Sequence, residues 1–501
     1  MFRKTLTAFK ENKFFFIILT ALFAIIAFRC FAFAPLTYFD EHNYLIEAQN
    51  IREHNINSLC NTNDNGQCQE YSIAPHGLGL SSIYALFYSY DFKQFYKQIS
   101  FFTLFLYLLN SIFIFIVATC LFSNKNIAKA SSLFILAMPY NIIYATNAMP
   151  PTLCNTLILI IMYCLSMLFD KTARQENQNG KRGGRLPHCI LTMLYTAILL
   201  SSIRVEYSIL LTVFIVFLAV VGLKKFSLKK IPFLTKYMLT VPLIALSYSY
   251  SCYYIQNKSH AGSQLGLQYF NFSYITLYFL NIGLCTMSLF FILYLIVFLK
   301  KLFKKEETED VALKISLISI FFLFIILYSF YNYRSIHRYI IPVTSIFILF
   351  STAGLNLLLK EFLKKRNRAW FLLIVLLLCI LITPKAFTLK NHLIEENTYI
   401  ASFIDILNES NLNRITKNYP NDSYYIFQAS YLGQTNRINN YLGDYNLATK
   451  KLEAGDNLFY IESPFGNIGD SDFGDTTKFK HTLLEKDSSG RYGIYKIELS
   501  G

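Results

Sequence analysis

The chain has 501 residues, of which 54% are hydrophobic and only 15% charged, so it is too apolar for an ordinary soluble protein. The net charge of +15 does not indicate a nucleic-acid partner, because lysine and arginine gather in alternate short loops between apolar runs. The composition therefore excludes a soluble enzyme and a nucleic-acid-binding protein, and it indicates a chain that crosses a membrane many times.

Apolar runs recur through the first 390 residues, and each is long enough to cross a hydrocarbon layer of about 30 Å as a helix. The expected fold is thus a polytopic α-helical membrane protein. We expect about eleven transmembrane helices, at 14–34, 99–122, 129–146, 150–169, 187–203, 206–223, 237–255, 275–299, 314–333, 339–359 and 369–389.

The basic residues predict how these helices are oriented. Loops rich in lysine and arginine face the cytoplasm, and here they lie at 3–13, 125–129, 171–185, 224–236, 300–314 and 360–368. The remaining loops, including 35–98, and everything after residue 390 then lie outside. We expect a bacterial inner-membrane protein with a cytoplasmic N-terminus and a periplasmic C-terminus. If the first run were instead a cleaved signal peptide, as Ala32-Phe33-Ala34 permits, the topology would not change.

The external loop 35–98 is too long for a simple connection. Its amphipathic stretches at 43–53 and 91–98 predict helices that lie along the membrane interface. It also contains Cys60 and Cys68 in the segment "SLCNTNDNGQCQEY". Because topology places this segment in an oxidising compartment, we expect a disulfide between them.

The last part of the chain, 391–501, differs in charge from what precedes it. It has 15 acidic against 10 basic residues, a net charge of −5, which leaves +20 for residues 1–390. A helical stretch near 399–410 is followed by short runs rich in Tyr, Phe and Ile between Gly, Asn and Asp. We expect two domains, namely a transmembrane catalytic domain at 1–390 that includes loop 35–98, and a small periplasmic α/β domain at 391–501.

Several ionisable residues lie where apolar runs meet the outer face. Charged groups at this depth are costly, so they usually face a partner or a cavity. The candidates are Arg29, Asp40, Glu41, His76, Arg204, Glu206, Arg334, His337 and Arg338. An alternative for the first pair is a solvated cap at the start of the helix that follows it, since acids favour helix N-termini.

Two acids and several arginines at one membrane face suit group transfer from a phosphate-linked lipid donor. A carboxylate such as Asp40 would take the proton of the acceptor as a general base. Guanidinium groups would neutralise the charge that grows on the departing phosphate. This combination favours a catalytic site over a helix cap.

The motifs resemble those of the GT-C superfamily of polyprenyl-phosphate-sugar glycosyltransferases, which includes protein O-mannosyltransferases and the lipid A aminoarabinose transferase. In that superfamily an Asp-Glu pair followed by a Tyr opens the first external loop, as "FDEHNY" does here with Asp40, Glu41 and Tyr44. The other similar segments are "YSIAPHGLGLSSIYAL" with His76, "SIRVEYSILL" with Arg204 and Glu206, and "HRYIIPV" with Arg338, Tyr339 and Pro342. The acid that many relatives carry before Pro-Leu is absent from "NAMPPTL".

The resemblance implies an inverting glycosyltransferase that moves a sugar from a polyprenyl-phosphate donor to an acceptor on the outer face. The acceptor would be lipid A or lipopolysaccharide, a wall polymer or a protein. Asp40 and Glu41 would be catalytic, and would hold Mg²⁺ or Mn²⁺ if a metal is used. The donor and acceptor pockets would be shaped by Tyr44, His76, Arg204, Glu206, Arg334, His337, Arg338 and Tyr339.

Two rival classes share some of these features. A lipid or solute transporter or flippase also has many spans and intramembrane charges, but it would show inverted repeats and broken helices near the bilayer midplane. The sequence shows neither, and its charges gather at one face. A non-catalytic membrane scaffold would tolerate the loss of Asp40, whereas an enzyme would not.

Overall fold

The computed structural model describes most of the chain up to residue 204 and parts of the remainder. The described residues are 12–32, 39–54, 58–62, 68–73, 78–89, 92–169, 185–204, 285–304, 311–330, 341–362, 370–384, 386–388, 414–415, 417–419, 422–426, 442, 445–462, 467–486 and 493–500. The spans expected at 206–223 and 237–255 lie outside these ranges, as does the whole stretch 399–410.

The chain divides into two compact units. Unit 1 comprises Met1–Phe33, His76–Leu80 and Tyr96–Lys390, and unit 2 comprises Ala34–Pro75, Ser81–Phe95 and Asn391–Gly501. Unit 1 holds the apolar helices, while unit 2 holds the rest of the external loop and the C-terminal part. Each unit is described by itself below.

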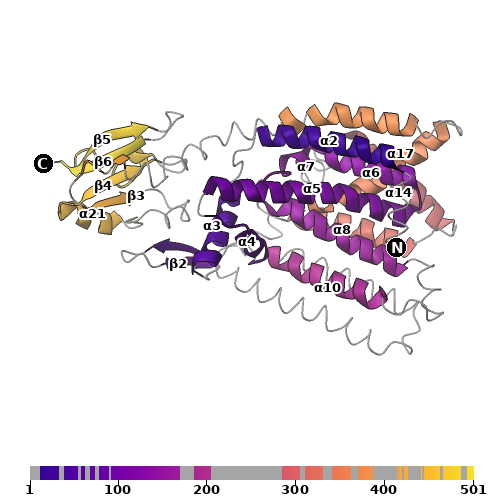
Figure 1. Cartoon of the computed structure of the whole chain (residues 1–501), viewed down its shortest axis with the longest axis horizontal. Coiled ribbons are helices and arrows are strands. Elements are labelled where there is room, and N and C mark those ends of the chain that lie inside the picture. Colours follow the sequence, from indigo (N-terminus) through magenta and orange to yellow (C-terminus); the bar gives the residue numbers. More distant parts are fainter. Residues whose placement is uncertain are drawn as a thin grey trace. The chain divides into compact units, whose positions relative to one another are not determined.

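Unit 1 is a bundle of helices that run alongside one another (Figure 1). Its elements are α2 (Lys13–Ala32), α5 (Phe92–Phe122), α6 (Lys125–Ala137), α7 (Pro139–Ile143), α8 (Pro150–Phe169), α10 (Arg185–Ile203), α14 (Cys285–Phe303), α15 (Val311–Ser329), η5 (Ile341–Val343), α17 (Thr344–Phe362) and a helix over Trp370–Thr388. Six helices in the described residues are long and apolar enough to cross a membrane, and a polytopic helical membrane protein is therefore confirmed.

Two sequence expectations need correction in this unit. The run at 129–146 is not one span, because α6 ends at Ala137 and a separate short helix, α7, begins at Pro139. Proline has no amide hydrogen and cannot continue the helix that precedes it, whereas it fits the first turn of a new one. The stretch 91–98 is not a separate interfacial helix either, since it forms the start of the long helix α5.

Close helix contacts in unit 1 rely on small residues and on hydroxyl pairs. Gly354 of α17 lies so near α14 that an added Cβ would come 1.9 Å from the carbonyl oxygen of Phe290. Ser131 of α6 and Thr352 of α17 share a hydrogen bond of 2.7 Å between buried hydroxyls. Helices in lipid associate through such contacts, because burial against lipid gives little driving force between apolar surfaces.

The external loop contains α3 (Phe39–His54), strands β1 (Ser58–Thr62) and β2 (Cys68–Ile73), and α4 (Leu78–Ala85). The helix expected over 43–53 is thus present, but the antiparallel hairpin β1–β2 was not foreseen. Its register sets Cys60 opposite Glu70 and Cys68 opposite Thr62, so the cysteines are diagonal neighbours. Diagonal positions are typically about 7–8 Å apart between Cα atoms, and the disulfide stays a prediction.

The C-terminal part of unit 2 forms a four-stranded mixed sheet in the order β3-β4-β6-β5. Its strands are β3 (Ser423–Ile426), β4 (Asn457–Ile461), β5 (Phe479–Lys486) and β6 (Gly493–Leu499). The outer strand β3 pairs parallel with β4, while β6 is antiparallel to both β4 and β5. Helix α21 (Tyr445–Glu453) packs against the sheet and buries Ala448 and Leu452.

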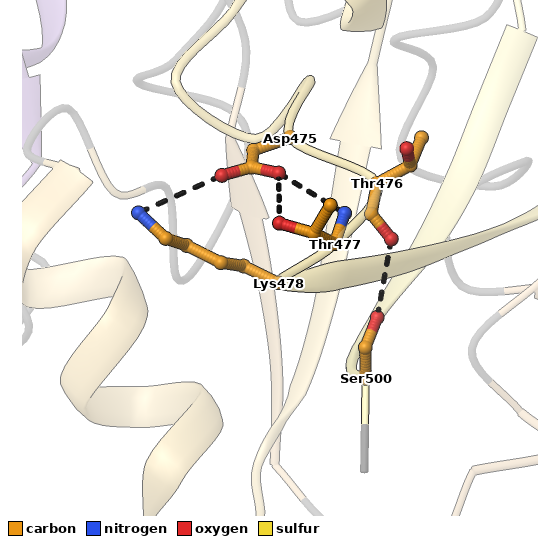
Figure 2. A network of polar contacts seen from close by, with 5 residues as sticks. All are labelled: Asp475, Thr476, Thr477, Lys478 and Ser500. Atoms are coloured by element: carbon orange, nitrogen blue, oxygen red, sulfur yellow. Dashed lines mark hydrogen bonds and ion pairs between the residues drawn. The ribbon is translucent and has the colours of Figure 1, made fainter.

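A polar turn precedes the outer strand β5 (Figure 2). Asp475 Oδ1 accepts hydrogen bonds from the amide of Thr477 at 3.0 Å and from its hydroxyl at 2.5 Å. These bonds favour the charged carboxylate and hold the pKa of Asp475 below its ordinary value of 3.8. Because the folded-state pKa is lowered, this stabilisation is present above the ordinary pKa and is lost as the pH falls below it.

A buried carboxylate ties together the strand ends of the same sheet. Glu462, which follows β4, is 8% exposed. Its two oxygens accept hydrogen bonds from the amide of Ile468 at 3.2 Å and from the amide of Gly493 at 3.0 Å. Glu462 therefore satisfies two backbone donors that lie outside the strand ladder.

Glu462→Ala should destabilise this sheet, because it leaves the amides of Ile468 and Gly493 buried without an acceptor. The expected cost is about 1–3 kcal/mol, the penalty for an unsatisfied buried polar group. Hydrogen exchange of the full-length protein should show faster exchange over 457–499 than in the parent. Glu453→Ala, at the exposed end of α21, is the matched control and should leave exchange in the strands unchanged. Unaltered exchange in Glu462→Ala would contradict this role.

Candidate active site

Helix α3 carries the acidic pair in its first turn. Its sequence, "FDEHNYLIEAQNIREH", is polar, yet Glu41, Tyr44, Glu47 and Asn50 are each 0% exposed. Successive positions are about 100° apart, so Glu41 and Asn50 lie on opposite sides of the helix, with Tyr44 and Glu47 between them. The helix is therefore surrounded on several sides, unlike the interfacial helix with one solvated face that its sequence suggests.

Burial excludes a solvent-exposed cap for one member of the acidic pair. A cap in solvent would leave its carboxylate exposed, whereas Glu41 is completely buried. A buried carboxylate is stable only with polar or charged partners. The backbone of Asp40 lies in the same turn of α3, but its side chain lies outside the described residues.

A second buried carboxylate on α3 was missed by the sequence analysis. Glu47 lies less than two turns beyond Glu41, and its Oε2 accepts a hydrogen bond of 2.6 Å from the hydroxyl of Ser81 in α4. Glu47 belongs to a stretch that looked merely amphipathic. The available signal was the Glu–Tyr–Glu spacing of three residues at 41, 44 and 47, which indicates neighbouring positions on a helix.

In unit 1, Arg204 directly follows the last residue of α10. Its side chain is only 9% exposed, and its amide donates to the carbonyl of Leu200 at 3.1 Å, which extends the helix by one residue. The start of α4 packs tightly on this helix end, since a Cβ on Gly79 would lie 2.1 Å from the hydroxyl oxygen of Ser202. A buried guanidinium at a helix end is suited to binding an anionic group.

The broken segment between α6 and α8 is buried except at Tyr140, which is half-buried, and the buried residues include the polar Thr146 and Asn147. Here side chains take over the backbone bonds that a continuous helix would make. The side-chain amide nitrogen of Asn141 donates to the carbonyl of Ile135 at 2.9 Å. The hydroxyl of Thr152 donates to the carbonyl of Tyr144 at 2.9 Å.

Two side chains of α5 complete this pattern. The hydroxyl of Tyr107 donates to the carbonyl of Leu136, and the amide nitrogen of Asn110 donates to the carbonyl of Thr152 at 3.1 Å. The buried amide oxygens of Asn110 and Asn141 have no hydrogen-bond partner among the described residues. This end of the bundle therefore offers buried polar groups where the missing family acid would stand.

The structure brings some of the expected site residues onto described elements and leaves others out. Glu41 and Tyr44 lie on α3 in unit 2, and Arg204 ends α10 in unit 1. Pro342, the last residue of the "HRYIIPV" motif, is buried in η5. The residues outside the described ranges are His76, Glu206, Arg334, His337, Arg338 and Tyr339.

The part of the chain that the structure describes contains no group of three or more His, Cys, Asp or Glu side chains that could hold a metal ion. Asp40 and Glu41 are adjacent on a helix, and adjacent helical positions do not face each other.

The sequence matches no protein-family model, and no curated protein sequence matches it either. Solved structures do match its fold. ArnT from Cupriavidus metallidurans, the lipid A aminoarabinose transferase, aligns in its apo state with a TM-score of 0.64 and 11% identity, over 97% of this chain and 98% of that one. The same protein bound to undecaprenyl phosphate aligns with a TM-score of 0.61 and 12% identity, over 96% and 97% of the two chains.

An oligosaccharyltransferase from Archaeoglobus fulgidus, tethered to an acceptor peptide, also matches. Its TM-score is 0.51 with 10% identity, and the alignment covers 99% of this chain and 75% of that one. Both proteins belong to the GT-C superfamily. At these identities the matches establish the fold, and this fold is the one that the sequence motifs predict.

Gly79→Ala tests the close approach of α4 to α10. The added methyl group would meet the hydroxyl oxygen of Ser202 at 2.1 Å and its backbone carbonyl carbon at 3.0 Å. Such overpacking typically costs about 1–3 kcal/mol, so thermal unfolding of the purified protein in detergent should occur at a lower temperature. Ser202→Ala in the same chain should recover part of the loss, because it removes the nearest atom.

Gly469→Ala is the control for this change. A Cβ at that position meets no atom within 4 Å, so its stability should equal that of the parent. If Gly79→Ala and Gly469→Ala unfold at the same temperature, α4 does not approach α10 as closely as described.

Proposed function

We propose that this chain, which has the GT-C fold, is a membrane glycosyltransferase that moves a sugar from a polyprenyl-phosphate donor to an acceptor at the outer face of the membrane. The observation that carries the proposal is the fold match to ArnT, which spans nearly the full length of both chains. A fold alone does not define a reaction. The residues on α3 and at the end of α10 add the chemistry that this reaction needs.

The proposed reaction is a displacement at the anomeric carbon of the sugar. A hydroxyl or amine of the acceptor attacks this carbon, and the bond between the carbon and the phosphate oxygen breaks on the opposite side. Attack from opposite the leaving group inverts the anomeric configuration. The acceptor loses its proton to the base, and polyprenyl phosphate departs with the bonding electrons.

Asp40 is the proposed base, and its place in the chain supports that role. It lies in the first turn of a helix that opens the external loop, directly beside a completely buried acid. The partial positive charge at a helix N-terminus favours an ionised carboxylate, which is the form that accepts a proton. Glu41 would orient the acceptor or the donor from within the buried part of α3.

Arg204 is the proposed partner of the departing phosphate. Its guanidinium keeps its charge at any working pH and can make two parallel hydrogen bonds to phosphate oxygens. It would act together with Arg334 and Arg338 if those residues contribute as the motifs suggest. Tyr44, His76, Glu206, His337 and Tyr339 are assigned to the walls of the donor and acceptor pockets.

A divalent ion remains part of the proposal. Mg²⁺ and Mn²⁺ prefer oxygen ligands, and one carboxylate from α3 together with phosphate oxygens of the donor would supply them. The buried carboxylate of Glu41 fits such a role. A bound ion would neutralise phosphate charge, and the protein groups would still position the acceptor and receive its proton.

Asp40→Asn is the principal test. It keeps the size and much of the hydrogen bonding of the side chain but removes its basic oxygen, so turnover should fall by about 10²- to 10⁴-fold. The measurement is release of polyprenyl phosphate from a panel of polyprenyl-phosphate-linked sugars by the purified protein. The turnover of Glu41→Gln should fall less than that of Asp40→Asn if Glu41 only orients a substrate.

Asp475→Asn is the matched control, because it makes the same chemical change at an exposed residue of the C-terminal sheet region. Its turnover should equal that of the parent. Binding of polyprenyl phosphate to Asp40→Asn should also persist, since the base is not required to hold the product. Near-parental turnover by a folded Asp40→Asn protein would show that this acid is only a helix cap.

The proposed orientation is tested separately with reporter tags. Tags inserted at 171–185, 224–236 or 360–368 should report a cytoplasmic location, because these loops carry the excess of lysine and arginine. Tags placed after residue 390 should report a periplasmic location. A cytoplasmic location for tags placed after residue 390 would contradict both the proposed topology and the proposed site at the outer face.

A further inference from the structure

A cavity of about 220 Å³ lies in unit 1 where the ends of five helices meet. The C-terminal ends of α5, α14 and α17 line it, as do the N-terminal ends of α6 and α15. One of its lining residues, Lys360, is 16 positions beyond the first residue of α17, Thr344, or about 24 Å along the helix axis. The cavity is therefore distinct from the helix ends at which Arg204 and the broken segment lie.

Three lysines from three different helices line this cavity. They are Lys301 of α14, Lys314 of α15 and Lys360 of α17. No aspartate or glutamate lines the cavity among the described residues. Like charges that share one cavity repel one another, and an anion bound among them would remove that repulsion.

Two simpler explanations do not account for all three lysines. Lys301 and Lys360 lie in the last turns of their helices, where a cation stabilises the negative end of the helix dipole. Lys314, however, is the fourth residue of α15, where a cation is unfavourable on the same argument. The rule that places basic residues in cytoplasmic loops explains which membrane face they occupy, but it does not require them to line one cavity.

Uncharged groups of the cavity also suit an anionic headgroup. Asn124 lines it at the start of α6, where the side-chain oxygen caps the helix by accepting from the amides of Asn126 at 2.9 Å and Ile127 at 3.4 Å. The positive end of the α6 dipole therefore adds to the potential of the lysines. Asn356, which is 7% exposed, adds a buried side-chain amide.

Part of the remaining wall of the cavity is aromatic. The rings of Phe122 and Tyr294 lie 6.2 Å apart in an edge-to-face arrangement, and Phe298 stacks on Tyr294 at 5.8 Å. The ammonium group of Lys314 lies 5.7 Å from the centre of the Phe122 ring. This contact holds one lysine at the cavity wall through a cation–π interaction.

The surroundings favour a lipid over a soluble anion. Besides the lysines, the cavity is lined by the apolar side chains of Ile127, Val297, Ala353 and Leu357, and it lies among the helices α5, α14 and α17, which are long and apolar enough to cross a membrane. The first carbons of the acyl chains would contact these apolar side chains while the headgroup reaches the lysines. Basic pockets between transmembrane helices on the cytoplasmic side are known to bind phosphate headgroups of anionic lipids.

We propose that this cavity binds the phosphate headgroup of an anionic phospholipid at the membrane face opposite to the proposed catalytic site. Lys301, Lys314 and Lys360 contact the phosphate oxygens, and the aromatic wall contacts the glycerol backbone. The site is independent of the proposed glycosyl transfer, since it uses none of the residues assigned to that reaction.

The test is native mass spectrometry of the full-length protein, delipidated in detergent and then mixed with phosphatidylglycerol, phosphatidylethanolamine or inorganic phosphate. Phosphatidylglycerol should bind more tightly than the other two. In the triple variant Lys301→Gln, Lys314→Gln, Lys360→Gln its affinity should fall by about 10²-fold, or about 5-fold for Lys314→Gln alone. If the triple variant does not fold, the affinity of Lys314→Gln for phosphatidylglycerol is the test.

The matched control is the triple variant Lys125→Gln, Lys300→Gln, Lys304→Gln. It removes the same charge from the same end of unit 1, at exposed lysines that do not line the cavity. It should retain parental affinity for phosphatidylglycerol. The proposal would be overturned if both triple variants lost the same affinity for phosphatidylglycerol, or if the parent bound the two lipids equally. Either result would mean that the lipid responds to surface charge and not to this cavity. Inorganic phosphate binding as tightly as phosphatidylglycerol would overturn the assignment to a lipid.

Discussion

The constraint on which the structure depends is that backbone polar groups inside a membrane must find partners within the protein. Continuous helices such as α5 and α8 meet it with their own hydrogen bonds. The chain between α6 and α8 does not, because Pro139 prevents one helix from running through. Side chains of Tyr107, Asn141 and Thr152 donate to the carbonyls of Leu136, Ile135 and Tyr144, which lie at this break.

The two ends of unit 1 differ in backbone regularity and in the charged residues that they carry. At the end where the helices break, the irregular backbone and buried amides form a polar interior, and Arg204 lies beside the tight contact of Gly79 with Ser202. At the other end the helices are regular, and lysines from α14, α15 and α17 surround a cavity. The first end suits the binding of a reacting phosphate group. The second suits the permanent binding of a membrane lipid.

Buried carboxylates have a different role in each part of unit 2. In the C-terminal sheet Glu462 is bound by two backbone amides, so its charge is used to hold strand ends together. On α3, Glu41 and Glu47 are buried in a helix that already satisfies its own backbone. Glu47 is tied to Ser81 and acts as a structural link between α3 and α4. Glu462 and Glu47 thus have structural partners, and the proposed catalytic roles are assigned to Asp40 and Glu41 at the start of α3.

The sequence by itself determined the class of protein, because hydropathy and loop charge are properties of short segments. It predicted a helix over 43–53, which in the structure begins at Phe39, together with the long helices such as α8 and α14 and the motifs typical of the GT-C fold. It could not show that 129–146 is broken by Pro139 with compensation from α5, since that depends on residues distant along the chain. Nor could it show that Glu41 and Glu47 are buried, or that Lys301, Lys314 and Lys360 line one cavity. Burial and convergence arise from contacts between segments far apart in sequence, and only the tertiary structure decides which segments meet.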